Sequence, residues 1–379
     1  SRAGLLTGLP EADLGRGLSI RPAVTTGGGI PAPGASVDGE FQPSLDVTQR
    51  MGSNTLASVT VNTDFAETEV DTRRTNLTRF PLFFPEKRTF FLEGADIFSF
   101  GLGLGQSLLP YYSRRVGLVS GTEVPILAGG KVNGRAAGTN LGVQVVSTND
   151  VAGVAPDTTM GVVRVKQNVL AESSVGLIAT AGDPRGRTGS WLLGADATYQ
   201  TSRLKGDKNF LLGVWGIAMG RDGLGSDSTA YGATVDYPND LWDVALSFKE
   251  IDADFRPALG FVRRTGIRKT NAKADFMPRP GRAGIRQLFL EASLQYVTDT
   301  GGRTLDWMVV ASPLGFETES GDGLRLEWVP QFERLDEPFE IQDGILIPAG
   351  DYHYTAWIVE LETAERRLWV AGLEARWGS

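Results

Sequence analysis

The stretch LFLEASLQY, residues 288–296, places an apolar side chain at every second position from Leu288 to Tyr296. Glu291, Ser293 and Gln295 lie between these apolar residues. Successive side chains of a β-strand point to opposite faces, so this period predicts a strand with one apolar and one polar face.

The same period recurs along the chain, and helical periodicity is nearly absent. Further clear segments are Phe41 to Val47, Trp191 to Tyr199, Trp242 to Phe248, Leu305 to Ala311 and Leu324 to Phe332. We count about 17 strands, many of roughly 8 to 11 residues with aromatic residues near their ends. Strands of a soluble sandwich are usually about 5 to 6 residues long, whereas a tilted strand needs about 9 to 11 to cross a bilayer. The pattern predicts an all-β fold, an antiparallel transmembrane outer-membrane β-barrel over residues 18–379.

The predicted connections alternate in length. Short connections are expected at 51–54, 170–173, 238–240, 278–284 and 364–367. Long connections are expected at 25–39, 64–124, 150–158, 220–227, 250–260 and 334–350. Outer-membrane barrels have short periplasmic turns and long extracellular loops, which explains the alternation. Because single-chain barrels have an even strand number, the odd count predicts a barrel that is incomplete at its C-terminus, which we favour, or one that closes against something else.

The composition of the chain argues against several kinds of binding site and catalytic site. The net charge is −8, there is no cysteine, and His353 is the only histidine. A nucleic-acid partner is therefore not expected, because binding phosphates along a strand requires a basic excess. Disulfides and thiolate metal sites are excluded, and a histidine-rich zinc site is impossible. We expect no catalytic residues, no enzyme activity and no cofactor.

Residues 62–101 interrupt the alternation with a segment that is both charged and aromatic. Such a segment would be costly in lipid, so we expect it to fold into the barrel interior as a plug or constriction within residues 62–124. The expected ion-pair network against the interior wall comprises Asp64, Glu67, Glu69, Asp71, Arg73, Arg74, Arg79, Glu86, Lys87, Arg88 and Glu93. The expected aromatic cluster, packed on itself, comprises Phe80, Phe83, Phe84, Phe90 and Phe91.

The string TDFAETEVDTRRTNLTRFPLFFPEKRTFFLEGADIFSFG, residues 63–101, is followed by YSRRVG at 112–117. Together they resemble the domain of unknown function 5916 family, and FRPALGF at 255–261 with Arg263 and Arg264 extends the resemblance. The resemblance implies an outer-membrane barrel preceded by a periplasmic domain similar to carbohydrate-binding module family 9. Residues 1–17, with LLTGL at 5–9, then resemble the junction after that domain. The family has no established activity.

Three alternatives exist for the acidic residues of the segment. Asp64, Glu67, Glu69 and Asp71 can pair with the neighbouring arginines, or converge on a calcium ion through oxygen ligands. Glu67, Glu69 and Asp71 could also supply an acid/base pair for glycosidic cleavage. We favour the ion pairs and assign no metal.

A basic run follows at Arg263, Arg264, Arg268, Lys269 and Lys273. These side chains would either pair with acidic residues on neighbouring strands, which we favour, or attract an anionic solute or lipopolysaccharide phosphate. His353 lies among aromatic residues, where we expect a position in an aromatic girdle or in the interior.

These features predict a bacterial outer-membrane element for passage or docking of a glycan or another polar solute. Its expected partners are membrane lipid and lipopolysaccharide, a periplasmic or surface protein, and a glycan. One alternative is a non-conducting barrel that anchors a partner protein. A second alternative is a soluble extracellular β-rich carbohydrate-binding protein.

Overall fold

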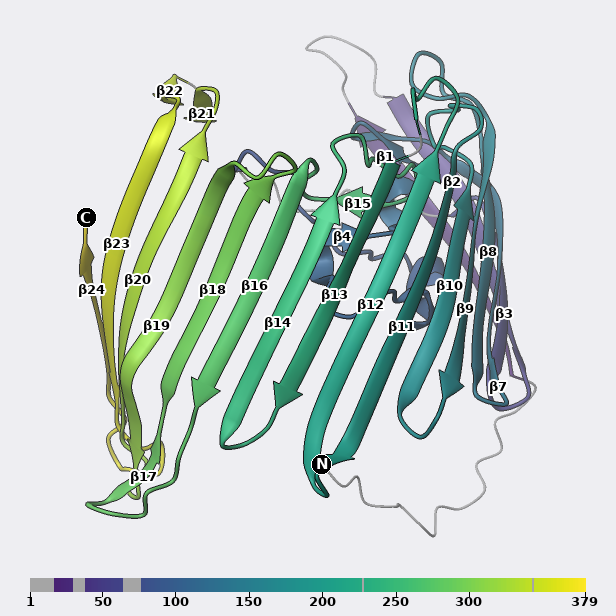
Figure 1. Ribbon diagram of the computed structural model, residues 1–379. Helices are drawn as coiled ribbons and strands as arrows, with labels where there is room; N and C mark the ends of the chain where they lie inside the picture. The colour runs from purple at the N-terminus through teal and green to yellow at the C-terminus, as the bar shows by residue number, and fades with distance from the viewer. Residues whose placement is uncertain (1–16, 30–37, 64–75, 227, 343) are drawn as a thin grey trace.

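The computed structural model describes residues 17–29, 38–63, 76–226, 228–342 and 344–379. One large antiparallel sheet dominates it and curls around a group of short elements (Figure 1). Its first strands are β1 (Leu18–Gly29), β2 (Asp38–Met51), β3 (Thr55–Val61), β7 (Ile126–Ala136), β8 (Thr139–Thr148), β9 (Thr158–Val169), β10 (Ser173–Ala181), β11 (Trp191–Leu204) and β12 (Lys208–Gly220). The sheet continues with β13 (Ser228–Pro238), β14 (Trp242–Ile251), β16 (Ile267–Phe276), β17 (Ile285–Leu288), β18 (Leu290–Asp299), β19 (Thr304–Thr318), β20 (Gly323–Leu335), β23 (Gly350–Glu362) and β24 (Gly372–Gly378).

Each sheet strand pairs with its neighbours along the chain, so the topology is a meander. The β17 and β18 strands are separated only at Phe289 and both pair with β19, so they share one place in the sheet. The predicted antiparallel all-β fold and the strand count are therefore confirmed. Among the described residues β1 pairs only with β2 and β24 only with β23, so no closed barrel is found.

Most connections are short at one end of the sheet and long at the other, although 277–284 and 363–371 at the first end are longer than tight turns. At one end lie tight turns such as those between β2 and β3, β7 and β8, β9 and β10, and β13 and β14. At the other end lie the long connections after β3, β8, β10, β12, β14 and β20 (Figure 1). The 300–303 connection between β18 and β19 is also at this second end, and it is short. We call the second end the long-connection end.

The described part of the long connection between β3 and β7 folds against the concave face of the sheet (Figure 1). We call its described part, residues 76–125, the insert. The insert contains the short elements α2 (Thr89–Leu92), η1 (Ala95–Phe98), η2 (Gly105–Ser107), β4 (Leu108–Leu109), η3 (Ser113–Arg115), β5 (Leu118–Val119) and β6 (Thr122–Glu123). The β4 strand pairs with β15 (Phe261–Val262), and β21 (Phe339–Gln342) pairs with β22 (Ile345–Ile347) in a separate hairpin.

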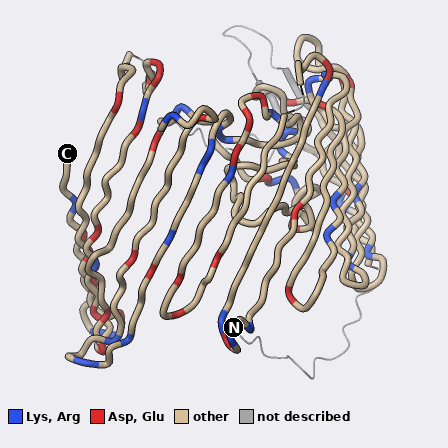
Figure 2. Tube along the Cα trace, in the orientation of Figure 1, with Lys and Arg blue, Asp and Glu red and all other residues tan. Residues whose placement is uncertain are grey.

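The two faces of the sheet differ in exposure. On the convex face, Leu290, Leu294 and Tyr296 of β18 are 36–39% exposed, whereas Val297 on the concave face is 2% exposed. Charged residues are more frequent near the strand ends than along the middle of the strands (Figure 2). The described residues therefore leave an apolar convex face uncovered.

The concave face is not uniformly polar, which corrects one expectation. Beneath the insert, a row that is in register across the strands contains Ile178, Gly194, Ile217, Ala230 and Ile251. The four of these that carry side chains are at most 4% exposed. The insert covers this wall with its own apolar residues, so the interior here is a packed core. No described helix is long and apolar enough to span a bilayer.

Candidate functional site

The insert contacts strands along almost the whole sheet. At one side, Glu93 forms an ion pair with Arg21 of β1 at 3.3 Å and accepts a hydrogen bond from Thr48 of β2. At the other side, Arg79 forms an ion pair with Glu333 of β20 at 3.2 Å. One segment therefore crosses the concave space between strands that lie far apart in the sheet.

Glycines on the sheet give the insert room to approach. A Cβ at Gly142 of β8 would lie 2.7 Å from Ile97 and 3.0 Å from the ring of Phe98. A Cβ at Gly213 of β12 would lie 2.5 Å from Leu102. Because real side chains do not approach this closely, these two positions require glycine if the insert is to keep its place.

Buried charges fix the insert to the wall. Arg164 of β9 and Asp196 of β11 form a two-pronged ion pair with N–O distances of 2.5 and 2.9 Å. Arg164 also donates to the backbone carbonyl of Ser99 at 3.0 Å, and Gly101 donates its N–H to Asp196 at 3.3 Å. Both insert residues are therefore held by the same buried pair.

A second buried network joins the two ends of the insert. Glu86 accepts hydrogen bonds from Arg88 Nε at 3.0 Å, Arg88 Nη2 at 2.9 Å and Ser113 Oγ at 2.6 Å. Arg88 also donates to the backbone carbonyls of Val116 and Ser113. Burial opposes the charged carboxylate, but the hydrogen bonds and charge of Arg88, together with Ser113, outweigh it and lower the pKa of Glu86.

The residues predicted for the ion-pair network divide into two groups. Asp64, Glu67, Glu69, Asp71, Arg73 and Arg74 lie outside the described residues, as does the calcium alternative. Among the others, Glu86 pairs with Arg88, and Glu93 and Arg79 pair with opposite parts of the sheet. Lys87 donates its backbone N–H to Glu86 at 2.9 Å.

The five predicted phenylalanines do not form a single cluster. Phe90 and Phe91 contact each other edge to face, with ring centroids 5.0 Å apart, near β3 and β7. Phe83 instead packs against Tyr112 and Phe261, and the ring of Phe80 lies under Arg264. Phe84 contacts Arg114. The aromatic residues are separated because each packs where the insert meets a different part of the molecule.

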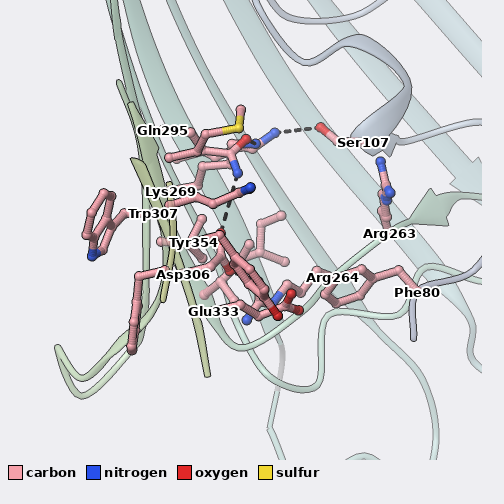
Figure 3. Close-up of a pocket in the computed structure, with 17 residues that line it drawn as sticks. Phe80, Ser107, Arg263, Arg264, Lys269, Gln295, Asp306, Trp307, Glu333 and Tyr354 are labelled. Carbon is pink, nitrogen blue, oxygen red and sulfur yellow. Dashed lines mark hydrogen bonds and ion pairs between the residues drawn. The ribbon is translucent and has the colours of Figure 1, made fainter. Parts of the chain in front are cut away.

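A cavity of about 300 Å³ lies where the insert faces β14, β16, β18, β19 and β20. Its charged lining residues are Lys249, Arg263, Arg264, Lys269, Asp306 and Glu333. Lys249 donates to Ser107 Oγ of the insert at 2.5 Å, Lys269 contacts Gln295, and Arg264 pairs with Asp306. In Figure 3 the labelled side chains converge from the insert and from several strands, while Trp307 points to the other side of the sheet.

The cavity lining mixes polar and apolar side chains. It offers cationic donors, two carboxylates and the amides of Gln295 and Gln331, beside apolar side chains that include Ile251, Ile267 and Val297. Convergent polar groups on a partly apolar wall are typical of small-solute binding sites. No group of three or more potential metal-ligating residues occurs in the described ranges.

The basic run in the sequence includes Arg263, Arg264 and Lys269 of this cavity. No sequence pattern points to its other charged residues, which are Lys249, Asp306 and Glu333. The last three lie on different strands and meet only through the sheet register. The favoured pairing of the basic run has counterparts in the structure: Arg264 with Asp306, Arg268 with Glu250, and Lys273 with Asp243. His353 packs against Phe332 with ring centroids 4.9 Å apart.

The fold and the site define a class of protein: a long antiparallel meander whose concave face is filled by an internal segment of the same chain. Residues 40–141, which extend from β2 into β8 and include the insert, match the family model described as Domain of unknown function (DUF5916). This match confirms the family resemblance. No curated protein and no solved structure matches the chain.

Proposed function

We propose that this chain forms the membrane-spanning wall of a bacterial outer-membrane β-barrel. The observation that carries the proposal is the apolar convex face, which no described element covers. Leu177, Leu193, Val214 and Leu246, from four different strands, are 47–58% exposed. Exposing a surface of this extent to water is costly, whereas acyl chains would solvate it.

Aromatic residues border the apolar face in the manner of interfacial girdles. Toward the long-connection end, Tyr296, Trp307, Phe332 and His353 are in register across four strands. At the opposite end, Trp242 stacks on Phe276 with ring centroids 4.4 Å apart. Trp242 and Phe248 mark the two ends of the apolar face of β14 and lie about 20 Å apart along the strand.

Bilayer insertion is tested by adding the full chain to phosphatidylcholine liposomes and floating them in a density gradient. We expect the protein to float with the liposomes, to resist a carbonate wash, and to require detergent for extraction. A full chain that stays monodisperse in buffer without detergent would contradict the proposal and favour the soluble alternative.

Within this barrel, we propose that the insert restricts passage and that the cavity near Lys249 and Asp306 holds a glycan or another polar solute. The contacts of the insert from β1 to β20 support the restriction. The mixed charges and the amide in the cavity support the polar class of solute. The same dense contacts also favour the alternative of a non-conducting barrel that anchors a partner.

Planar-bilayer conductance distinguishes passage from anchoring. Residues 76–84, which include Arg79 and Phe80, are replaced by a short Gly-Ser linker, and conductance is expected to rise because the contacts with β20 and the cavity are removed. The control replaces residues 339–347, the hairpin of β21 and β22, which projects beyond the sheet at the long-connection end (Figure 1). If neither the original chain nor the 76–84 variant conducts, the anchoring alternative is favoured.

A further inference from the structure

A second cavity, of about 350 Å³, lies at the long-connection end of the sheet. It is formed by the end of the insert together with the connections after β10, β12 and β14. Arginines from each of these four segments line it: Arg115, Arg185, Arg221 and Arg256 are examples. The fold thus brings arginine side chains from four separate segments of the chain into one cavity.

Positive charge greatly exceeds negative charge in this cavity. Its single lining carboxylate is Asp183, which is 1% exposed. That carboxylate already accepts hydrogen bonds from Arg187 Nε at 2.6 Å, the backbone N–H of Arg185 at 2.8 Å and Ser190 Oγ at 3.1 Å. Its acceptor capacity is therefore largely used by its own loop.

Most of the lining guanidinium groups have no carboxylate partner among the described residues. Arg187 pairs with Asp183, and Arg264 pairs with Asp306 on the other cavity. No ion pair within the described part of the chain involves Arg115, Arg185, Arg221, Arg256 or Arg263. The Nη1 of Arg221 is buried and makes no hydrogen bond to the described residues.

The electrostatics of Arg115 reflect this crowding. Desolvation and the positive charges of Arg185 and Arg187 lower the pKa of the Arg115 guanidinium. Like charges gathered at a partly desolvated site repel one another, and an anion placed among them removes that repulsion. Guanidinium groups also match the geometry of phosphate oxygens with two parallel hydrogen bonds, so phosphate is the anion that this lining suits best.

We propose that this arginine cavity binds a multiply charged phosphate group. The group is either part of a soluble phosphorylated compound or a phosphate on the headgroup of an outer-leaflet lipid. This inference goes beyond the proposed passage function, since it requires neither conductance nor a ligand in the cavity near Lys249.

The test uses the full chain in detergent micelles and measures inorganic pyrophosphate binding by isothermal titration calorimetry. The test variant is the double substitution Arg185→Gln and Arg256→Gln. Both side chains are exposed and neither takes part in an ion pair among the described residues, so folding should be preserved. The matched control is Arg203→Gln with Arg282→Gln, two exposed arginines at the end of the sheet opposite the long-connection end. Circular dichroism verifies that both variants are folded.

We expect saturable pyrophosphate binding that the test variant weakens at least about tenfold and the control leaves unchanged. A parallel arm measures association with bilayers that contain lipopolysaccharide and with phosphatidylcholine bilayers. Loss of binding only in the lipopolysaccharide arm of the test variant would identify a lipid phosphate as the ligand. The proposal is overturned if neither probe binds, or if the test and control variants bind equally well.

Discussion

At the residue scale, the interior charges act as fixed points for the insert. Arg164 is fully buried, and its side chain joins two strands to the carbonyl of Ser99. Removing one member of a buried ion pair leaves an uncompensated charge in a poorly solvated place. The insert should therefore be sensitive to small chemical changes at these residues.

Asp196→Asn is expected to destabilise the protein by about 3 to 5 kcal/mol, because it keeps the shape of the side chain but leaves the Arg164 charge unpaired. The free energy of unfolding is measured by urea titration followed by tryptophan fluorescence. Asp207→Asn, in the exposed pair with Lys208, is the control and should change stability little. Equal effects of the two substitutions would show that the buried pair does not hold the fold.

The lowered pKa of Glu86 predicts that the folded protein loses stability in acid. Its pKa is lowered in the folded protein, so its contribution to stability is present above the unfolded pKa of about 4.3 and is lost as the pH falls through the folded value. We expect Glu86→Gln to lower stability at neutral pH and to flatten the decline in stability below pH 4.3. Urea titrations between neutral and acidic pH measure both effects, and parallel pH curves for the two proteins would argue against this role.

At the scale of elements, glycines and bulky insert residues are matched across the concave face. Gly142 lies under Ile97 and Phe98, and Gly213 lies under Leu102. The strand therefore supplies space and the insert supplies volume. Neither segment can change at these points without the other.

Gly142→Ala should destabilise the insert by about 1 to 3 kcal/mol, because the added methyl group overlaps Ile97 and Phe98. Gly130→Ala on β7 is the control, since a Cβ there meets nothing within 4 Å. Limited proteolysis of residues 76–125 is the readout. Cleavage of the insert should be faster in the Gly142→Ala variant alone, and similar rates in both variants would count against this packing.

The strands were predictable from the sequence because alternation is a local property. The alternation around Leu294 and Leu246 predicted both the strands and their exposed faces correctly. The packing of the insert was not predictable, because the encounter of Leu102 with Gly213 depends on register across several strands. Arg115, Arg185 and Arg256 likewise line one cavity only because the fold brings the ends of distant strands together. Leu192 and Ile217 lie on the concave face, where a polar wall was expected, because the insert supplies its own apolar cover.

At the scale of the whole molecule, substitutions at two adjacent residues of β18 can show which face of the sheet contacts lipid. Leu294 is on the convex face of β18, and Ser293 is on the concave face. Leu294→Arg should reduce insertion into liposomes, since arginine on the lipid face costs about 2 to 4 kcal/mol near the bilayer centre. Ser293→Arg should insert normally. Liposome flotation compares the two variants, and equal insertion would contradict a lipid-facing convex surface.

The contacts of the insert with both β1 and β20 have a mechanical consequence. A twisted sheet of this width would otherwise be free to open or flatten, since its outermost strands are not joined to each other among the described residues. The insert bridges the two flanks of the sheet, so we expect it to limit how far they can move apart. A ligand that displaces the insert would therefore alter the curvature of the whole sheet.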